Sequence, residues 1–267
     1  MSKNSKNHSL LGRALKGRLA VGDLMLCLTV RYSRSVEIVR IAKLAGYDAL
    51  YLDLEHSTMT IETCAQISLA ATMAGILPLV RVPSHGHHHI SRVLDGGAQG
   101  VIVPHVNNAA EAEAVIDASC YPPIGKRSLS GLGPLAGLSV STEEAYKLIN
   151  ENTLRIVMLE SPEAITKADE IAAVEGIDML LIGTNDLCAE MGIPGQLDHE
   201  RVRAAYQTMA DACKSHGKAI GIGGIKEGPM LEDIYAMGGR FLMGRVDSAL
   251  MTQAAAKEVA DFRKLMP

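Results

Sequence analysis

Short apolar runs alternate with segments of helical periodicity along the chain, and this alternation limits the fold more than any other feature of the sequence. Each run is nearly continuous in Val, Ile, Leu and Met and ends in polar residues. Continuous apolar character in runs of this length is typical of parallel strands that are covered on both faces. We predict eight such strands, at residues 21–28, 48–55, 77–82, 100–106, 154–160, 178–183, 218–223 and 240–244.

The segments between these runs carry apolar residues at three- and four-residue spacing and therefore predict helices. Strict alternation of strand and helix indicates right-handed βαβ units. Eight units in about 240 residues favour a closed α/β barrel of the (β/α)₈ type, with an open doubly wound sheet as the alternative. No linker or composition break divides the chain, so we expect an N-terminal tail over residues 1–11 and one barrel domain over residues 12–267. The predicted helices span residues 35–46, 61–75, 89–97, 110–120, 142–152, 162–176, 199–217 and 229–239.

The composition favours a soluble acidic enzyme. Of the 267 residues, 48% are hydrophobic and 21% are charged, which excludes a mainly disordered chain. The net charge of −4 and the absence of Trp argue against a nucleic-acid surface, which needs basic stripes and stacking aromatics. We expect neither a secretory signal nor a membrane-spanning helix. Five scattered cysteines without a CxxC or CxxH pair predict reduced thiols in a cytoplasmic protein, rather than a disulfide framework or a zinc site.

One connection is longer than a compact barrel needs. Between the helices at 110–120 and 142–152 the chain runs through the Gly- and Ser-rich segment YPPIGKRSLSGLGPLAGLSVS (121–141). Long loops in compact domains commonly carry function. We therefore expect this segment near the catalytic rim of the barrel, with an inserted surface loop as the alternative.

Polar residues at the strand ends are the candidate site, because chemistry in a (β/α)₈ barrel lies where its strands end. Glu160 and Asp186 follow two consecutive strands, which would be about 4.8 Å apart in a parallel ladder. Two carboxylates that close repel each other unless a cation lies between them. Their hard oxygen atoms favour Mg²⁺ or Mn²⁺ over zinc. The alternative is a helix N-cap for one carboxylate and a surface ion pair for the other.

Two further ionisable residues lie at strand ends. His56 follows the strand end Asp53-Leu54-Glu55, and a neutral imidazole oriented by a carboxylate is a suitable base near neutral pH. Asp53 is the expected orienting partner, although a histidine at this position can also be purely structural. Arg81 lies inside an apolar run, where a buried guanidinium needs an anion. That anion is either a substrate carboxylate or a structural partner such as Asp53, Glu55 or Asp95.

Several motifs, in order along the chain, resemble the HpcH/HpaI aldolase family of metal-dependent pyruvate aldolases, which includes the 2-keto-3-deoxy-sugar-acid aldolases. The motifs are AGYDALYLDLEH, PLVRVP, VLDGGAQGVIVPHV, YPPIGKRS, the strand ending LES, and IGTNDLCAEMG. The resemblance covers residues 12–265. It implies a TIM barrel with an extra C-terminal helix that is exchanged between neighbours in a hexamer, a trimer of dimers.

The resemblance also implies roles for the residues at the strand ends. Glu160 and Asp186 match the metal-binding carboxylates of the family. His56 matches its catalytic base, with Asp53 as the partner of that base. Arg81 matches the arginine that holds the pyruvate oxygens.

Positions elsewhere in the chain also match the family's site. Gly183, Thr184 and Asn185 match the segment whose backbone amides receive the substrate carboxylate. Asp95 matches an acidic residue that comes from a neighbouring subunit and lies near the base. Arg127 matches an arginine of a substrate-binding loop.

Three positions depart from the family pattern, which leaves the substrate range and the metal preference open. The family often has Gln where this chain has Met158, and Gly-Pro-Ala-Asp where this chain has Gly-Thr-Asn-Asp at 183–186. It often has Gly where this chain has Ser128. Met158 should point to the same side of its strand as Glu160, because side chains alternate along a strand.

The implied reaction is the reversible cleavage of a 4-hydroxy-2-oxo acid to pyruvate and an aldehyde, through an enolate stabilised by a divalent cation. The expected cation is Mg²⁺ or Mn²⁺, with Co²⁺ as a further candidate. No lysine stands at a strand end, which argues against a Schiff base. The alternatives are a CoA-ester lyase of the citrate-lyase β type, an oxaloacetate-like 2-oxo acid decarboxylase, and a catalytically inert binding protein on a barrel scaffold.

Overall fold

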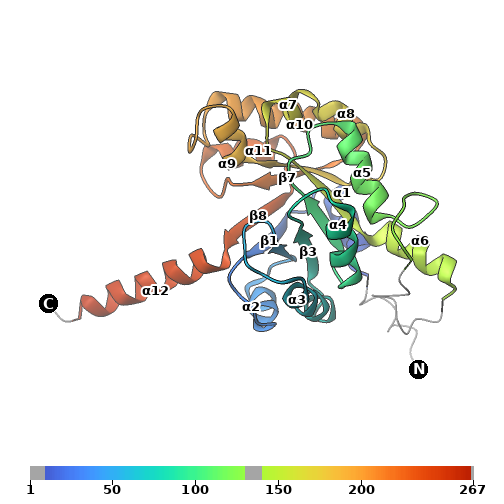
Figure 1. Ribbon diagram of the computed structural model, residues 1–267. Helices are drawn as coiled ribbons and strands as arrows, with labels where there is room; N and C mark the ends of the chain where they lie inside the picture. The colour runs from blue at the N-terminus through green and yellow to red at the C-terminus, as the bar shows by residue number, and fades with distance from the viewer. Residues whose placement is uncertain (1–9, 130–139, 266–267) are drawn as a thin grey trace.

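Eight parallel strands form a closed barrel in a computed structural model that describes residues 10–129 and 140–265 (Figure 1). The strands follow one another around the barrel in chain order, and β8 pairs with β1 to close it. The prediction of a (β/α)₈ barrel is therefore confirmed, and an open sheet is excluded. The strands are β1 (Met25–Val30), β2 (Ala49–Asp53), β3 (Leu77–Arg81), β4 (Gly100–Val103), β5 (Leu154–Leu159), β6 (Met179–Gly183), β7 (Ala219–Gly223) and β8 (Phe241–Val246).

Side chains alternate between the interior of the barrel and the helix layer around it, as the pleat of a strand requires. On β2, Ala49 and Tyr51 lie in the interior cluster, whereas Leu50 and Leu52 pack against the helices. Both faces are apolar, which explains why the strands were recognisable as continuous apolar runs. At the carboxyl end of β2 the next inward position is Asp53, so the interior changes from apolar to charged at the rim.

Each predicted helix is present, and residues 12–20 and 184–190 form two further helices that were not among the predicted ones. Residues 162–176, predicted as a single helix, form two short helices, because Lys167 leaves helical geometry between them. The extra C-terminal helix is confirmed. The helices are α1 (Gly12–Ala20), α2 (Glu37–Ala45), α3 (Ile61–Ala74), α4 (His87–Asp95), α5 (Ala109–Ser119), α6 (Thr142–Asn152), α7 (Pro162–Thr166), α8 (Ala168–Ala173), α9 (Thr184–Glu190), α10 (Glu200–His216), α11 (Pro229–Ala236) and α12 (Asp247–Arg263).

The long connection does not lie at the catalytic rim, so that prediction is wrong for its described part. Residues 121–129 follow α5 and lie at the amino ends of the strands, where the Tyr121 amide donates a hydrogen bond to Asn150 of α6. The Arg127 amide binds the carbonyl of Cys120 at the end of α5. A connection from a helix back to the next strand returns to the amino end of a barrel, opposite the rim. Residues 130–139 of the segment lie outside the described residues.

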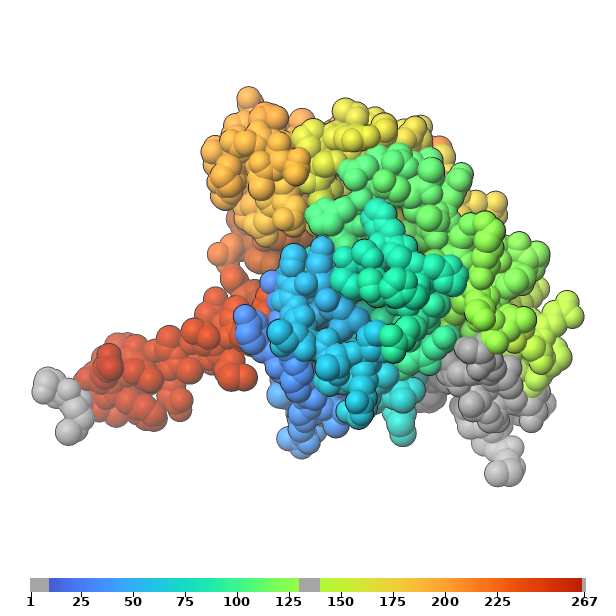
Figure 2. All heavy atoms as spheres, viewed as in Figure 1, coloured from blue at the N-terminus to red at the C-terminus, as the bar shows by residue number. Residues whose placement is uncertain are grey.

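The last helix leaves the barrel instead of packing on it. In Figures 1 and 2, α12 extends away from the body of the molecule as a single arm. Asp247 at its start is its one buried residue. The Asp247 carboxylate accepts hydrogen bonds from the backbone amides of Arg31, Tyr32 and Ser33 after β1. This contact fixes both the exit of α12 and the backbone that follows β1.

Two findings concern the expected cellular environment. Among the described residues, no helix is long and apolar enough to cross a membrane. All five cysteines, Cys27, Cys64, Cys120, Cys188 and Cys213, are free and buried, so the predicted absence of a disulfide framework is confirmed.

Candidate active site

The carboxylate of Asp53 lies at the centre of the charged rim and is completely buried. Arg81 binds it with two nitrogens, Nε at 3.0 Å and Nη2 at 2.6 Å. The Nε atom of Arg31 donates to the same carboxylate at 2.6 Å, and the amides of Glu55 and His56 donate at 3.1 Å each. Burial acts to raise the pKa of Asp53, but the bonds from Arg81 outweigh it, and the pKa is lowered. Asp53 is therefore a permanent anion.

Arg81 has acidic partners on all three guanidinium nitrogens. Besides its two bonds to Asp53, it places Nη1 at 2.7 Å from Glu55, and its side chain is only 4% exposed. The structural partners considered for Arg81 from the sequence, Asp53 and Glu55, are therefore both present. Asp95, the third, is paired elsewhere. Beyond this structural pairing, the sequence analysis gave Glu55 no role in the site, although it stands two residues from Asp53 at the same strand end.

The imidazole of His56 is not oriented by Asp53, which corrects the sequence interpretation. Only the backbone amide of His56 bonds to Asp53. Its side chain is half exposed, and its Nε2 lies 3.9 Å from Glu55. The physical reason is that both oxygens of Asp53 are occupied by arginine and amide donors. Glu55 is the carboxylate beside the imidazole.

Glu160 follows β5 and carries a buried carboxylate with one unused oxygen. Its Oε2 accepts a hydrogen bond of 2.8 Å from the backbone amide of His105, whose ring Nδ1 lies 3.2 Å away. Its Oε1 is buried without a hydrogen-bond partner. Burial raises the pKa of Glu160 to about 7; the amide and ring of His105 oppose this, and the negative charges of Asp186 and Glu55 add to it. An unpaired buried acceptor of this kind is costly unless a ligand satisfies it.

His105 joins the two acidic halves of the rim. Its backbone has a φ of 53°, the one positive value among the described non-glycine residues. This conformation lets its amide and its ring face Glu160 together, while Nε2 lies 3.4 Å from Glu55. Strained backbone of this type is found where surrounding contacts enforce it, often at functional sites.

Asp186 lies in the first turn of α9, directly after β6, and is half-buried. It is close enough to Glu160 for its charge to raise the pKa of that residue. Among the described residues, no group of three or more His, Cys, Asp and Glu side chains is arranged to hold a metal ion. The fit to a divalent cation therefore rests on two carboxylates, one with an unsatisfied oxygen. Mg²⁺ binds in this manner, through one or two carboxylates, and keeps other positions for water and substrate.

The segment after β6 offers backbone rather than side chains to this site. A Cβ atom on Gly183 would lie 2.7 Å from Cγ and 2.8 Å from Cδ of Glu160, so only glycine leaves room for the carboxylate. The hydroxyl of Thr184 is buried and already bonded to the Gly223 carbonyl and the Tyr206 hydroxyl. Asn185 is exposed. Of the three substrate-binding residues that the resemblance implied, Thr184 can contribute only its backbone.

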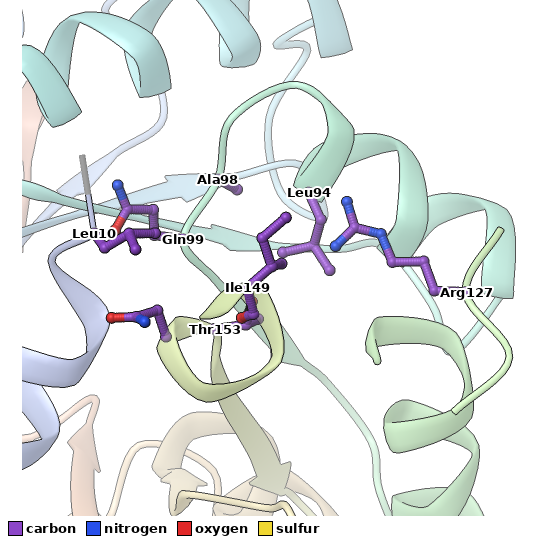
Figure 3. Close-up of a pocket in the computed structure, with 8 residues that line it drawn as sticks. Leu10, Leu94, Ala98, Gln99, Arg127, Ile149 and Thr153 are labelled. Atoms are coloured by element: carbon purple, nitrogen blue, oxygen red, sulfur yellow. Dashed lines mark hydrogen bonds between the residues drawn. The ribbon is translucent and has the colours of Figure 1, made fainter. Parts of the chain in front are cut away.

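Asp95 and Arg127 lie far from this rim in their own chain. They form an ion pair of 2.6 Å at the end of α4. Arg127 lines a small pocket with Gln99 and Thr153, which precede β4 and β5, as Figure 3 shows. Glu160 stands at the other end of β5, and seven residues of strand span about 23 Å. Asp95 and Arg127 therefore do not share the site of their own chain.

Two rim residues, Arg31 and His105, were not recognised from the sequence. His105 lies within the predicted strand 100–106, and reading the last polar residue of that strand, as was done for 48–55 and 154–160, would have included it. Arg31 follows β1 directly, but the predicted strand ended at residue 28, two residues before the observed end of β1. Among the described residues, Lys226 is a half-buried lysine three residues after β7, and its Nζ donates to the Met243 carbonyl.

Comparison with known proteins identifies the family of this chain. Residues 31–227 match the model of the HpcH/HpaI aldolase/citrate lyase family. The chain belongs to this family. It is 38% identical over 246 residues to a 4-hydroxy-4-methyl-2-oxoglutarate aldolase of Hapsidospora irregularis, covering 90% of this chain and 91% of the relative.

A second relative and a solved structure agree with this assignment. A 2-keto-3-deoxy-L-rhamnonate aldolase of Escherichia coli K12 is 31% identical, covering 96% of this chain and 95% of the relative. The crystal structure of an HpcH/HpaI aldolase from Desulfitobacterium hafniense has a TM-score of 0.89 at 28% identity, covering 95% of this chain and 97% of that one. The protein is thus a lyase of the aldolase type, and the predicted enzyme class is confirmed. Dependence on a divalent metal is typical of the family.

Replacing Gly183 with alanine should weaken cation binding at Glu160. The added methyl group would displace the carboxylate, since its Cβ would lie within 2.8 Å of Cγ and Cδ. We expect the affinity for Mn²⁺ to fall about 10-fold or more, as it does when groups that orient metal ligands are disturbed. Isothermal titration with Mn²⁺ measures this. Gly17→Ala on α1, where a Cβ meets nothing within 4 Å, is the control, and equal affinities for the two variants would contradict the geometry.

The raised pKa of Glu160 should make the metal-free protein less stable as pH rises. Between pH 4.5, the ordinary value, and about 7, the folded state holds a proton that the unfolded chain has lost. Stability therefore falls through this window and is level on either side of it. Thermal unfolding of the wild type and of Glu160→Gln is measured with chelator present. The Tm of the wild type minus that of the variant should be smaller at pH 7.5 than at pH 5. Parallel profiles would refute the shift.

Proposed function

We propose that the enzyme reversibly cleaves a 4-hydroxy-2-oxo acid to pyruvate and a second carbonyl compound. The observation that carries this proposal is the unsatisfied Oε1 of Glu160, which lies over Gly183 and beside Asp186. Such an oxygen suits a cation shared with a chelating 2-oxo acid. The names of two relatives, aldolases of 4-hydroxy-4-methyl-2-oxoglutarate and of 2-keto-3-deoxy-L-rhamnonate, describe substrates of this class.

Glu160 and Asp186 would hold the cation, for which we propose Mg²⁺ or Mn²⁺, with Co²⁺ as a further candidate. When bound, it supplies a Lewis acid that offsets the negative charge developing on the keto oxygen of the substrate. The amides that begin α9, after Gly183, face the same place and would receive the substrate carboxylate.

The basic residues of the rim would orient the substrate and move its proton. Arg81 has one N–H each left on Nη1 and Nη2 beyond its bonds to Asp53 and Glu55, which can meet a developing oxyanion. His56 is half exposed and stands beside Glu55, so it can exchange the hydroxyl proton of the substrate with solvent. Asp53 holds Arg81 in place and does not itself titrate in the working range. Asp95 and Arg127 would act only toward the site of a neighbouring chain.

Chelation should abolish the aldolase reaction, and Mg²⁺ or Mn²⁺ should restore it. With 4-hydroxy-4-methyl-2-oxoglutarate as substrate, pyruvate release is followed by coupling to lactate dehydrogenase. We expect Glu160→Gln and Asp186→Asn to lose at least about 100-fold in kcat/KM, the scale of a lost electrostatic contact in a transition state. Glu200→Gln, an exposed acid on α10, is the matched control.

Three results would contradict this mechanism. Full activity in chelator would exclude a catalytic role for the cation, and a borohydride-trapped adduct would indicate a Schiff base. Release of CO₂ from oxaloacetate without cleavage of any hydroxy acid would assign the same site to a decarboxylase.

We further propose that the chain forms a homo-oligomer in the cytoplasm, a hexamer built as a trimer of dimers, with α12 packed on a neighbouring barrel. Beyond Asp247, α12 exposes Met251 and Phe262. On the outer side of β1 and β8, a hollow of about 320 Å³ is lined by Leu26 and Leu242, among others. The exposed apolar side chains of α12 would complement such a hollow on a neighbouring barrel.

Removing α12 should reduce the size of the assembly. A chain ending at Leu250 keeps Asp247 and its contacts with the backbone after β1, so the barrel should fold. Light scattering should give the mass of six chains for the intact protein and a smaller species for the truncated one. An unchanged mass after truncation would refute a role for α12 in assembly.

A further inference from the structure

Arg31 stands at the rim on the side opposite Glu160. It follows β1, on which Met25 and Cys27 lie in the barrel interior, and continues the same inward alternation. In a closed barrel of eight strands in chain order, β1 faces β5 across the mouth. Its Nε donates to Oδ2 of Asp53 at 2.6 Å, the oxygen that Nη2 of Arg81 also binds. The two guanidinium groups therefore meet on one buried carboxylate.

Arg31 and Arg81 differ in how many of their N–H donors remain available to a ligand. Arg81 is almost fully buried and meets acids through all three of its nitrogens. Arg31 is 30% exposed, and its two terminal nitrogens make no hydrogen bond to any described residue. A guanidinium has five N–H donors, so Arg31 keeps four of them for a ligand. Its terminal nitrogens form a fork that matches a carboxylate.

The position of Arg31 is fixed from both ends of the residue. Its backbone amide donates to Asp247 at 3.2 Å, together with the amides of the next two residues. Its Nε is held by Asp53. Other cations lie nearby, because burial lowers the pKa of Lys226 to about 8 and the positive charges of Arg245 and Arg31 lower it further. A preorganised cation of this kind binds an anion without first losing side-chain freedom.

We propose that Arg31 is a specificity-determining residue, which binds a carboxylate on the second carbonyl compound and so favours acceptors that carry a carboxylate over neutral ones. The inference rests on the proposed function, which places the pyruvate half of the substrate between Glu160, Asp186 and Arg81. A substrate that extends from there across the mouth brings its far end to Arg31. A neutral polyol tail would leave the four N–H donors of Arg31 without a charged partner.

A carboxylate fits Arg31 better than a phosphate does. One planar fork pairs with the two oxygens of a carboxylate in a bidentate manner. The other cations around Arg31 have partners of their own, since Arg245 pairs with Glu227 and the Nζ of Lys226 donates to the Met243 carbonyl.

The test compares two acceptors of nearly equal size, glyoxylate and glycolaldehyde, which differ by a carboxylate against a hydroxymethyl group. Condensation of each with pyruvate is followed by NMR with Mn²⁺ or Mg²⁺ present, and the measured quantity is the ratio of kcat/KM for glyoxylate to that for glycolaldehyde. Any general effect on Asp53 or on pyruvate binding cancels in this ratio. We expect Arg31→Gln to lower the ratio about 10- to 100-fold, as loss of a hydrogen bond to a charged group does.

Control variants sharpen the comparison. Arg31→Lys, which keeps the charge, should retain part of the preference. Arg40→Gln, a largely exposed arginine on α2 paired with Glu37, should not change the ratio. A ratio for Arg31→Gln within about twofold of the wild type would overturn the proposal and leave Arg31 as a positioning residue for Asp53.

Two further outcomes separate the proposal from the function on which it rests. Exchange of the methyl protons of pyruvate for deuterium by the wild type reports on the pyruvate half-reaction without any acceptor. Its absence with every divalent cation would refute the proposed aldolase reaction, whereas exchange with an unchanged acceptor ratio refutes only the role of Arg31. A wild-type preference for glycolaldehyde phosphate over glyoxylate would overturn the assignment of a carboxylate.

Discussion

A single carboxylate, that of Asp53, organises one half of the rim. It has no solvent exposure and accepts five hydrogen bonds, from two arginines and two backbone amides. Three of these donors come from strand ends, because Arg31 follows β1 and the register pairs Asp53 with Arg81 of β3. A buried charge is tolerated only with such complete pairing. Both oxygens of Asp53 therefore bind arginine and amide donors, and neither is available to orient an imidazole.

In the other half of the rim, the buried carboxylate of Glu160 is not fully paired. Glu160 keeps one buried oxygen without a donor, and the nearby Asp186 adds repulsion instead of relief. His105 occupies only the second oxygen, and the absence of a side chain on Gly183 leaves room for the first one. The buried carboxylate of Asp53 is thus paired internally, whereas that of Glu160 needs an external cation. The substrate is expected to bridge the two halves.

The sequence predicts the fold well because the physics that forms the strands is local. A strand such as β3, covered on both faces, must be apolar throughout, and the run 77–82 was recognised for that reason. The rim residues Asp53, Arg81 and Glu160 follow from the same runs by alternation. Which polar group meets which does not follow, because it depends on register and on how the chain turns after a strand. His56 donates its backbone amide to Asp53. His105 contacts Glu160 through a backbone with positive φ, which its residue type does not predict. Topology determines that residues 121–129 lie at the amino end of the barrel. The composition of this loop does not carry that information, and it led to the wrong prediction that the loop lies at the catalytic rim.

In the proposed oligomer, the separation between Asp95 and the rim would link assembly to catalysis. Asp95 ends α4, at the amino end of the barrel, where it is paired with Arg127. A nine-residue helix is about 13 Å long, and α4 starts near the rim after β3, so no side-chain rotation carries Asp95 back to Glu55 or His56. If Asp95 acts near the base, as the family resemblance implies, it does so on another chain. The side chain of Asp95 is 38% exposed and that of Arg127 1%, which leaves the carboxylate, and not the guanidinium, facing outward. A neighbouring subunit would therefore meet Asp95 with its charge already oriented, and a monomer of this enzyme would lack one of its acidic groups.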